Sequence, residues 1–176
     1  MSPEPSAASA SVYDESSYVH MLEKAAASDR LRWNFNIHES FSDPCQRFFN
    51  AISPGTYIRP HRHLGSWADE IITCVYGSAL LVVFDDFGCV TDAIRLGISD
   101  QLRSAVPVTV VKKGQWHTVL STSEGAVLLE AKAGPFIPDC AKEFASWSPA
   151  ESTAGVRQFL KEITGKAFQV LKQSEE

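Results

Sequence analysis

The stretch "PGTYIRPHRHLGSWADEIITCVYG", Pro54 to Gly77, holds the residues that decide both the fold and the candidate chemistry of this chain. His61 and His63 lie two residues apart, so on a strand their side chains point to the same face. Glu70 follows a segment that we expect to form a loop, and an antiparallel returning strand would bring its carboxylate beside both imidazoles. Neutral imidazole is the commonest metal ligand in proteins, so the stretch predicts part of a metal site.

A third histidine, His117, belongs to the same pattern. It follows the turn residue Gly114 in "GQWH" and opens another predicted strand. Asp69 is an alternative carboxylate ligand, although its side chain would point to the other face of the strand. Written out, the spacing is Gly55-x5-His61-x-His63-x6-Glu70-x6-Gly77, then Gly114-x2-His117.

The rest of the chain predicts the architecture that would hold such a site. From Arg47 to Phe136, short apolar runs are separated by turn residues about every 8 to 12 positions, which is typical of an antiparallel all-β sandwich or barrel. We expect one strand to end at Gly77 and "TSEG", 122–125, to form a turn between two strands. "LRWNFNIH", 31–38, alternates apolar and polar residues; its polar face either meets solvent or binds a ligand, and consists of Arg32, Asn34, Asn36 and His38.

The composition divides the chain into three parts, of which one is a folded domain. Residues 1–14 are rich in Ser, Pro and Ala, and we expect a disordered tail. Residues 15–151 form the β domain, which begins with a short helix capped by Ser16 or Ser17 and then the alternating strand. Residues 152–176 are a helical extension, with an amphipathic pattern that we expect to break at Gly165.

Composition excludes several classes of partner. The net charge is −5 and no basic stripe is present, which argues against nucleic acid and anionic membranes. The longest apolar run, 79–84, is far too short to span a bilayer. Four widely spaced cysteines give no C-x-x-C pair, and the N-terminus has no secretory pattern, so we expect a cytoplasmic, reduced protein.

The two-part histidine pattern resembles the signature of the cupin superfamily. That resemblance implies a single-domain cupin, a double-stranded β-helix or jelly-roll barrel, with one metal held by His61, His63, Glu70 and His117. The second part departs from the usual pattern, with Lys112 in place of Pro and Ser121 in place of Asn.

A closer resemblance covers about residues 30–151. The segments "RWNFNIH", "DPCQR", "PGTYIRPHRH", "VLLEAKAGPF" and "KEFASWSPAE" are similar to WbuC-type cupin-fold metalloproteins. The name of that family implies a link to O-antigen and polysaccharide metabolism.

The donor set and its neighbours predict an open metal site in a pocket. Imidazole and carboxylate ligands without thiolate suit Fe, Mn, Ni, Co or Zn with a free coordination position. Strand parity and chemistry nominate further residues. The candidates for proton transfer, or for charged groups in the pocket, are Tyr76, Glu130 and Lys132. The candidates for substrate binding are Tyr57, Arg59, Trp67 and Trp116.

These features predict an enzyme, a metal-dependent cupin of the isomerase or dioxygenase type that acts on a small polar, sugar-like substrate. Two alternatives stay open: a non-catalytic module that binds or senses a carbohydrate, and a structural protein whose metal stiffens the barrel. The strand at 31–38 is also a candidate contact for a homodimer.

Overall fold

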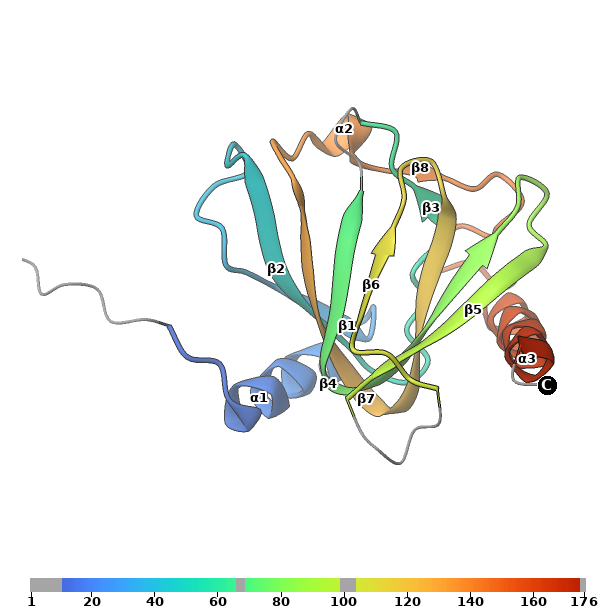
Figure 1. The fold of residues 1–176 in the computed structure, drawn as a ribbon, viewed down its shortest axis with the longest axis horizontal. Helices are drawn as coiled ribbons and strands as arrows, with labels where there is room; N and C mark the ends of the chain where they lie inside the picture. Colours follow the sequence, from blue (N-terminus) through green and yellow to red (C-terminus); the bar gives the residue numbers. More distant parts are fainter. Residues whose placement is uncertain (1–10, 66–68, 99–103, 175–176) are drawn as a thin grey trace, which may run out of the picture.

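A curled antiparallel sheet with a helix at each end of the chain makes up the protein (Figure 1). This computed structural model describes residues 11–65, 69–98 and 104–174. The elements are α1 (Glu15–Ala26), β1 (Arg32–Asn36), β2 (Cys45–Ile52), β3 (His61–Arg62), β4 (Glu70–Phe84), β5 (Val90–Gly97), β6 (Val108–Val111), β7 (Trp116–Ala133), α2 (Pro138–Ala141), β8 (Glu143–Phe144) and α3 (Val156–Ser174). The predicted all-β, barrel-like class with flanking helices is confirmed.

Two long strands connect the sheet. The described strands follow the order β1-β2-β7-β3-β8, while β4 pairs with β5, β6 and β7. The predictions that a strand ends at Gly77 and that 122–125 separates two strands are wrong, because β4 and β7 run through these points for 15 and 18 residues. Shifts in the β4–β7 register between Cys74 and Tyr76 and between Gly77 and Ala79 bend both strands without ending them.

The bend depends on the glycine at position 77. Gly77 has φ of +69°, and a Cβ atom there would lie 2.1 Å from the carbonyl oxygen of Gly125 on β7. Only glycine allows this backbone conformation and this close approach together. Gly77, which was predicted to end a strand, is therefore the residue at which β4 bends.

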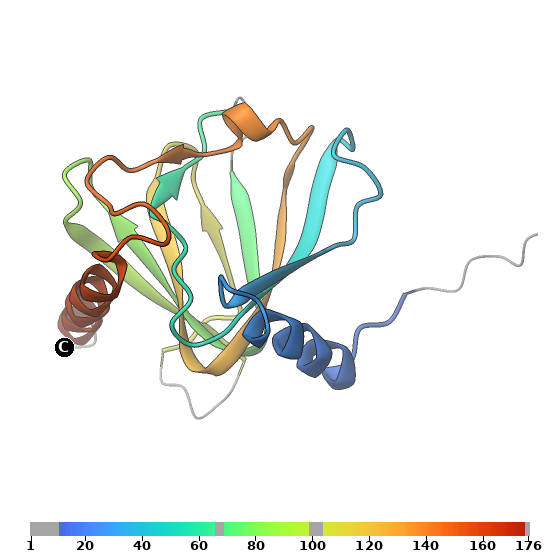
Figure 2. The ribbon, with the colours of Figure 1, turned by 180° about the vertical axis from the view of Figure 1, so that it is seen from behind.

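Alternation along the strands separates an interior core from two outer cores. The interior cluster includes Ile72, Cys74, Leu81, Val119 and Leu128. On the outer face of the sheet, α1 covers β1 and β2, whereas α3 packs beside β5 at the other end (Figures 1 and 2). The side chains that share parity with the interior cluster, and lie nearer the strand ends, form the candidate site.

Both helices differ from the predictions in one detail. Asp14, rather than Ser16 or Ser17, caps α1, and its Oδ1 accepts the backbone N–H of Ser17 at 3.0 Å. The helix α3 continues through Gly165, because burial of its apolar face outweighs a glycine penalty of about 1 kcal/mol. Most of the predicted tail, residues 1–10, lies outside the described residues. No helix in the described ranges is long and apolar enough to cross a membrane.

Candidate metal centre and adjoining pocket

Three buried histidines meet at one end of the barrel interior. His61 on β3 is the direct register partner of His117 on β7, and their ring centroids are 4.4 Å apart. The ring of His63, just after β3, lies 5.1 Å from that of His61 and 5.6 Å from that of His117. One nitrogen of each ring lies within 4.8 Å of the others. The His117 side chain points inward because it shares the parity of Val119 in the interior core.

Backbone carbonyls fix the orientation of all three imidazoles. The Nδ1 atoms of His61, His63 and His117 lie 2.9, 2.6 and 2.9 Å from the carbonyl oxygens of Arg59, Ala141 and Gln115. A carbonyl oxygen can only accept, so each Nδ1 carries the proton and each neutral ring keeps its lone pair on Nε2. Burial, followed by the charge of Lys142 and the nearby imidazoles, holds the pKa of His61 well below its usual value, which favours the neutral form.

Glu70 completes the cluster from β4. It is 2% exposed, and its Oε2 lies 3.4 Å from Nε2 of His63 and 3.5 Å from Nε2 of His117. Its Oε1 accepts a hydrogen bond of 2.9 Å from Nζ of Lys132. Burial alone would raise the pKa of Glu70, but the adjacent ammonium group of Lys132 holds it well below its usual value.

The electrostatics of the cluster fit a bound cation. With Nδ1 protonated, the lone pairs on Nε2 of His63 and His117 face a carboxylate oxygen with no proton between them. Nε2 of His63 is buried and makes no hydrogen bond. A divalent ion would satisfy these electron-rich atoms together, and the donor set of imidazoles and a carboxylate suits such an ion. The cluster could therefore hold a metal.

The rival carboxylate lies elsewhere. Asp69 is exposed, and its two oxygens accept hydrogen bonds of 2.9 Å from Nζ of Lys112 and from the backbone N–H of Lys113. The alternation of β4 turns Asp69 outward and Glu70 inward, so of the two acids only Glu70 approaches the imidazoles.

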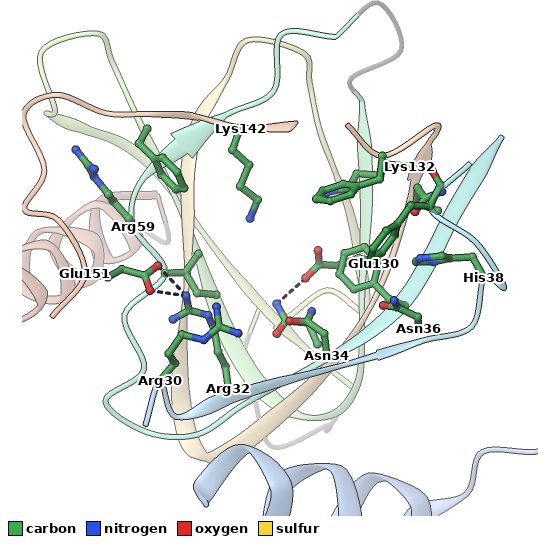
Figure 3. A pocket seen from close by; sticks show the side chains of 17 residues that line it. Arg30, Arg32, Asn34, Asn36, His38, Arg59, Glu130, Lys132, Lys142 and Glu151 are labelled. Carbon is green, nitrogen blue, oxygen red and sulfur yellow. Dashed lines mark hydrogen bonds and ion pairs between the residues drawn. The ribbon is translucent and has the colours of Figure 1, made fainter. Parts of the chain in front are cut away.

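The second feature of this region is a cavity of about 470 Å³ (Figure 3). Its wall includes Lys132, which contacts Glu70, and Phe144, which is the register partner of His61. The polar face of the strand at 31–38 lines this cavity, and two of its side chains, Asn34 and Asn36, are exposed to solvent. Its described lining residues are Arg30, Arg32, Asn34, Asn36, His38, Phe41, Gln46, Phe48, Asn50, Ile58, Arg59, Glu130, Lys132, Phe136, Lys142, Phe144 and Glu151.

Two charged residues of β7 lie between the pocket and the candidate metal ligands. Lys132 is the register partner of Glu70, and Glu130 is that of Ile72, so both side chains point inward. Oε1 of Glu130 accepts a hydrogen bond of 2.8 Å from Nδ2 of Asn50. Burial, with a smaller contribution from the charge of Glu70, raises the pKa of Glu130 to about 7. Glu130 is therefore a carboxyl group that can change protonation near neutral pH.

Arg59 and Tyr57 are held by the segment that follows β8. The guanidinium group of Arg59 donates to Oγ of Ser148 and to the carbonyl oxygen of Ala145, and lies 5.3 Å from the ring centroid of Phe144. Arg59 lines the pocket, but its guanidinium group points away from the centre of the cavity (Figure 3). Tyr57 is buried, and its hydroxyl donates to the carbonyl oxygen of Pro149, which places it outside this cavity.

The predicted placement of Tyr76 and Trp116 in the pocket is wrong. The bulge between Cys74 and Tyr76 reverses the parity of β4, so Tyr76 packs against Tyr18 of α1 on the outer face. Trp116 adjoins His117 and therefore faces the opposite side, where it contacts Arg62 and belongs to the core beneath α3. The remaining predicted residue, Trp67, lies outside the described residues.

Three polar or charged residues among those that the sequence did not single out are Asn50, Glu151 and Lys142. Asn50 lies on β2, and Glu151 accepts two hydrogen bonds of 2.7 and 2.8 Å from Nη2 of Arg32. Lys142 lies between α2 and β8, and its side chain extends into the cavity (Figure 3). These residues come from distant segments without a shared spacing, so no periodic signal in the sequence identifies them.

Comparisons with known proteins agree with this fold. A family model described as a domain of unknown function (DUF6016) matches residues 13–96, a region that contains His61, His63 and Glu70 but ends before His117. No curated protein matches the chain.

Several solved structures are similar. A protein from Shewanella oneidensis has a TM-score of 0.53 and 16% identity, with 76% of this chain and 81% of that chain covered. The capsular polysaccharide assembling protein CapF from Staphylococcus aureus has a TM-score of 0.51 and 18% identity, with 67% of this chain and 32% of CapF covered. A cupin superfamily protein from Desulfitobacterium hafniense has a TM-score of 0.45 and 16% identity, with 61% and 81% covered.

At such identities the likeness to the Shewanella oneidensis protein and to CapF shows the fold alone. The protein has a mostly β, curled antiparallel sheet with N- and C-terminal helices, and this fold is similar to those of the two proteins. The finer resemblance to WbuC-type proteins stays a prediction.

Proposed function

We propose that the protein is a small metal-dependent cupin enzyme that acts on a small polar substrate held beside the ion. The observation that carries this proposal is the convergence of three imidazoles and the carboxylate of Glu70 next to a cavity of about 470 Å³. A volume of this size falls within the range of about 300–1,000 Å³ found for small-molecule sites. The ligand set proposed is His61, His63, Glu70 and His117.

A divalent ion at this position would supply a Lewis acid with a free coordination site. The surrounding residues would divide the remaining work. Lys132 holds one oxygen of Glu70 and so orients the other toward the imidazoles. Glu130, with a pKa of about 7, is suited to accept or donate a proton at the pocket wall.

A non-catalytic binding module is the second candidate, and the amide-lined wall favours it. Asn34 and Asn36 of β1 offer hydrogen bonds to a polar ligand without any need for the metal. For both candidate functions we propose that the ligand is sugar-like and that the protein has a role in polysaccharide metabolism. It is supported by the amide and aromatic lining and by the WbuC resemblance.

Metal content tests the first part of the proposal. The full chain, purified without chelator and reloaded with each candidate metal, should retain about one equivalent by plasma emission. His61→Ala and His117→Ala should each lose most of it, whereas His20→Ala, at an exposed position of α1, should not. Less than about half an equivalent on the reloaded wild type, or equal content in all variants, would exclude the metal centre.

Turnover separates the enzyme from the binding module. Ligands that raise the melting temperature of the metal-loaded protein would be incubated with it and followed by NMR. Product formation that Glu130→Gln abolishes, with ligand affinity kept, supports the enzyme. A ligand that binds and stays unchanged through long incubation supports the binding module.

A further inference from the structure

Lys142 presents to the pocket an ammonium group that pairs directly with no carboxylate of the described residues. Its side chain descends from the segment between α2 and β8 toward the middle of the cavity (Figure 3). Its ammonium group forms no hydrogen bond or ion pair with any residue in the described ranges. Lys142 as a whole residue is exposed to solvent, while its ammonium end lies within the cavity, where a small ligand can reach it.

The carboxylates around Lys142 are engaged elsewhere. Glu151 places both of its oxygens on Nη2 of Arg32, and Glu70 places Oε1 on Nζ of Lys132. Glu130 accepts from Asn50, and its raised pKa keeps it partly protonated near neutral pH. None of the three forms an ion pair with Lys142, although the charges of Glu70 and Glu130 act on its ammonium group from a distance.

The local charge balance also favours an anion. The described lining of the cavity carries five cationic side chains and two acidic ones, whereas the whole chain has a net charge of −5. The walls of the cavity desolvate the ammonium group of Lys142, and the nearby charge of Lys132 adds repulsion, so its pKa is lowered. An anionic group placed against Lys142 would relieve both costs.

The rest of the lining indicates the chemistry of the ligand beyond its charge. Asn50 is 8% exposed, and its Oδ1 makes no hydrogen bond; Nε2 of the buried His38 is likewise without a partner. Asn34 and Asn36 add amide groups, and the ring of Phe48 adds an apolar wall. Such a lining suits a compact ligand that carries several hydroxyl groups on a carbon skeleton.

We propose that the pocket binds a small hydroxylated organic anion, whose carboxylate or phosphate group lies against the ammonium group of Lys142. This inference rests on the proposed function, because it names the substrate class of the same pocket. The anionic end would anchor the ligand at Lys142, while its hydroxyl groups would meet the amides of β1 and β2.

The test compares matched probes that differ in charge. Calorimetric titrations of the full chain would use D-glucuronate, D-glucose 6-phosphate, neutral D-glucose and inorganic phosphate. Each probe would be titrated into wild type, Lys142→Gln and the control Lys166→Gln, which removes an exposed lysine of α3. Metal-loaded and chelator-stripped samples would be run in parallel, with metal content measured for each.

We expect the sugar acid or the sugar phosphate to bind at least about tenfold more tightly than glucose, with the tighter of the two identifying the anionic group. Lys142→Gln should remove most of that advantage, about tenfold, and leave metal content unchanged; Lys166→Gln should change neither. If inorganic phosphate binds more tightly than the sugar derivatives, the proposal that the ligand carries hydroxyl groups is wrong.

Three outcomes would overturn the proposal. Glucose could bind as tightly as D-glucuronate and D-glucose 6-phosphate, neither of these two anions could bind, or Lys142→Gln could bind them with the affinity of wild type. These failures are distinct from failure of the metal centre. Loss of the metal hypothesis appears in the metal content, whereas the contribution of Lys142 persists in the stripped samples if the anion site exists.

Discussion

Lys132 and Glu70 face each other across β7 and β4, and Nζ of Lys132 lies 2.9 Å from Oε1 of Glu70. The pair leaves Oε2 of Glu70 directed at His63 and His117. The two flanking carboxylates, Glu70 and Glu130, raise the pKa of Lys132 despite its burial, so the lysine stays charged. Lys132 is thus a positioning residue for a candidate metal ligand.

Replacing Lys132 by methionine should destabilise the metal-free protein by about 3 kcal/mol, because Glu70 is left buried without a counter-charge. Adding the metal should restore much of the loss, since the ion then supplies the missing positive charge. Denaturant unfolding with and without metal measures both effects.

The exposed pair of Lys112 and Asp69 provides the matched control. Its Nζ–Oδ2 distance is also 2.9 Å, but both side chains are at least half exposed to solvent. Lys112→Met should leave the unfolding curves unchanged within error. A loss in Lys132→Met that metal does not reduce would contradict a role beside the ion.

The raised pKa of Glu130 predicts a pH-dependent loss of stability. The native state holds the proton up to about pH 7, whereas the unfolded chain releases it near the ordinary value of 4.5. The native state therefore binds more protons between these values, and stability falls as the pH rises from about 4.5 to 7.

Glu130→Gln removes this contribution, because its amide does not titrate. Relative to wild type, the variant should gain about 3 kcal/mol between pH 4.5 and pH 8, as measured by urea unfolding of chelator-treated protein. Parallel stability curves for the two proteins over this range would show that Glu130 keeps an ordinary pKa.

Tyr76 should be dispensable for the pocket. Its ring packs on Tyr18 outside the barrel, so Tyr76→Phe should keep both metal content and probe affinity within about twofold of wild type. The same measurements on Lys142→Gln serve as the comparison, since that side chain lines the cavity and its loss should weaken probe binding. A tenfold loss of probe affinity in Tyr76→Phe would place the phenol in the site after all.

Two glycine substitutions should change the stability of the protein in opposite directions. Gly77→Ala introduces a Cβ atom 2.1 Å from the carbonyl oxygen of Gly125 at a positive φ, and should cost about 3 kcal/mol or more. Gly165→Ala lies inside α3 with no atom within 4 Å of the new Cβ, and should stabilise by about 0.5–1 kcal/mol. Melting temperatures of both variants test the bend in β4 and the continuity of α3 together.

Turn spacing along the chain predicted the fold class, and spacing on one strand predicted the pairing of His61 with His63. The place of His117 beside them followed from the resemblance of the two-part pattern to the cupin signature. Inward parity placed His117 with Val119, and the loop before β4 allowed Glu70 to return beside His63. Such local patterns survive folding whenever the strand stays regular.

The errors arose where a strand is irregular. The predicted inward direction of Tyr76 was wrong because a bulge precedes it. The long strands β4 and β7 also continue through glycines that ordinarily mark turns. A bulge is decided by pairing with a distant strand, so a local pattern does not contain it. The pocket residues Lys142 and Glu151 were missed for a related reason, since they reach the cavity from a segment with little regular structure.

The carbonyl oxygens of Arg59, Gln115 and Ala141, which hold the three imidazoles, belong to the main chain. Any residue at positions 115 and 141 that keeps the local backbone offers the same acceptor. The side chains at these two positions can therefore vary in charge and size during evolution, and with them the environment of the three histidines. The Nε2 lone pairs keep their direction as long as the backbone keeps its conformation.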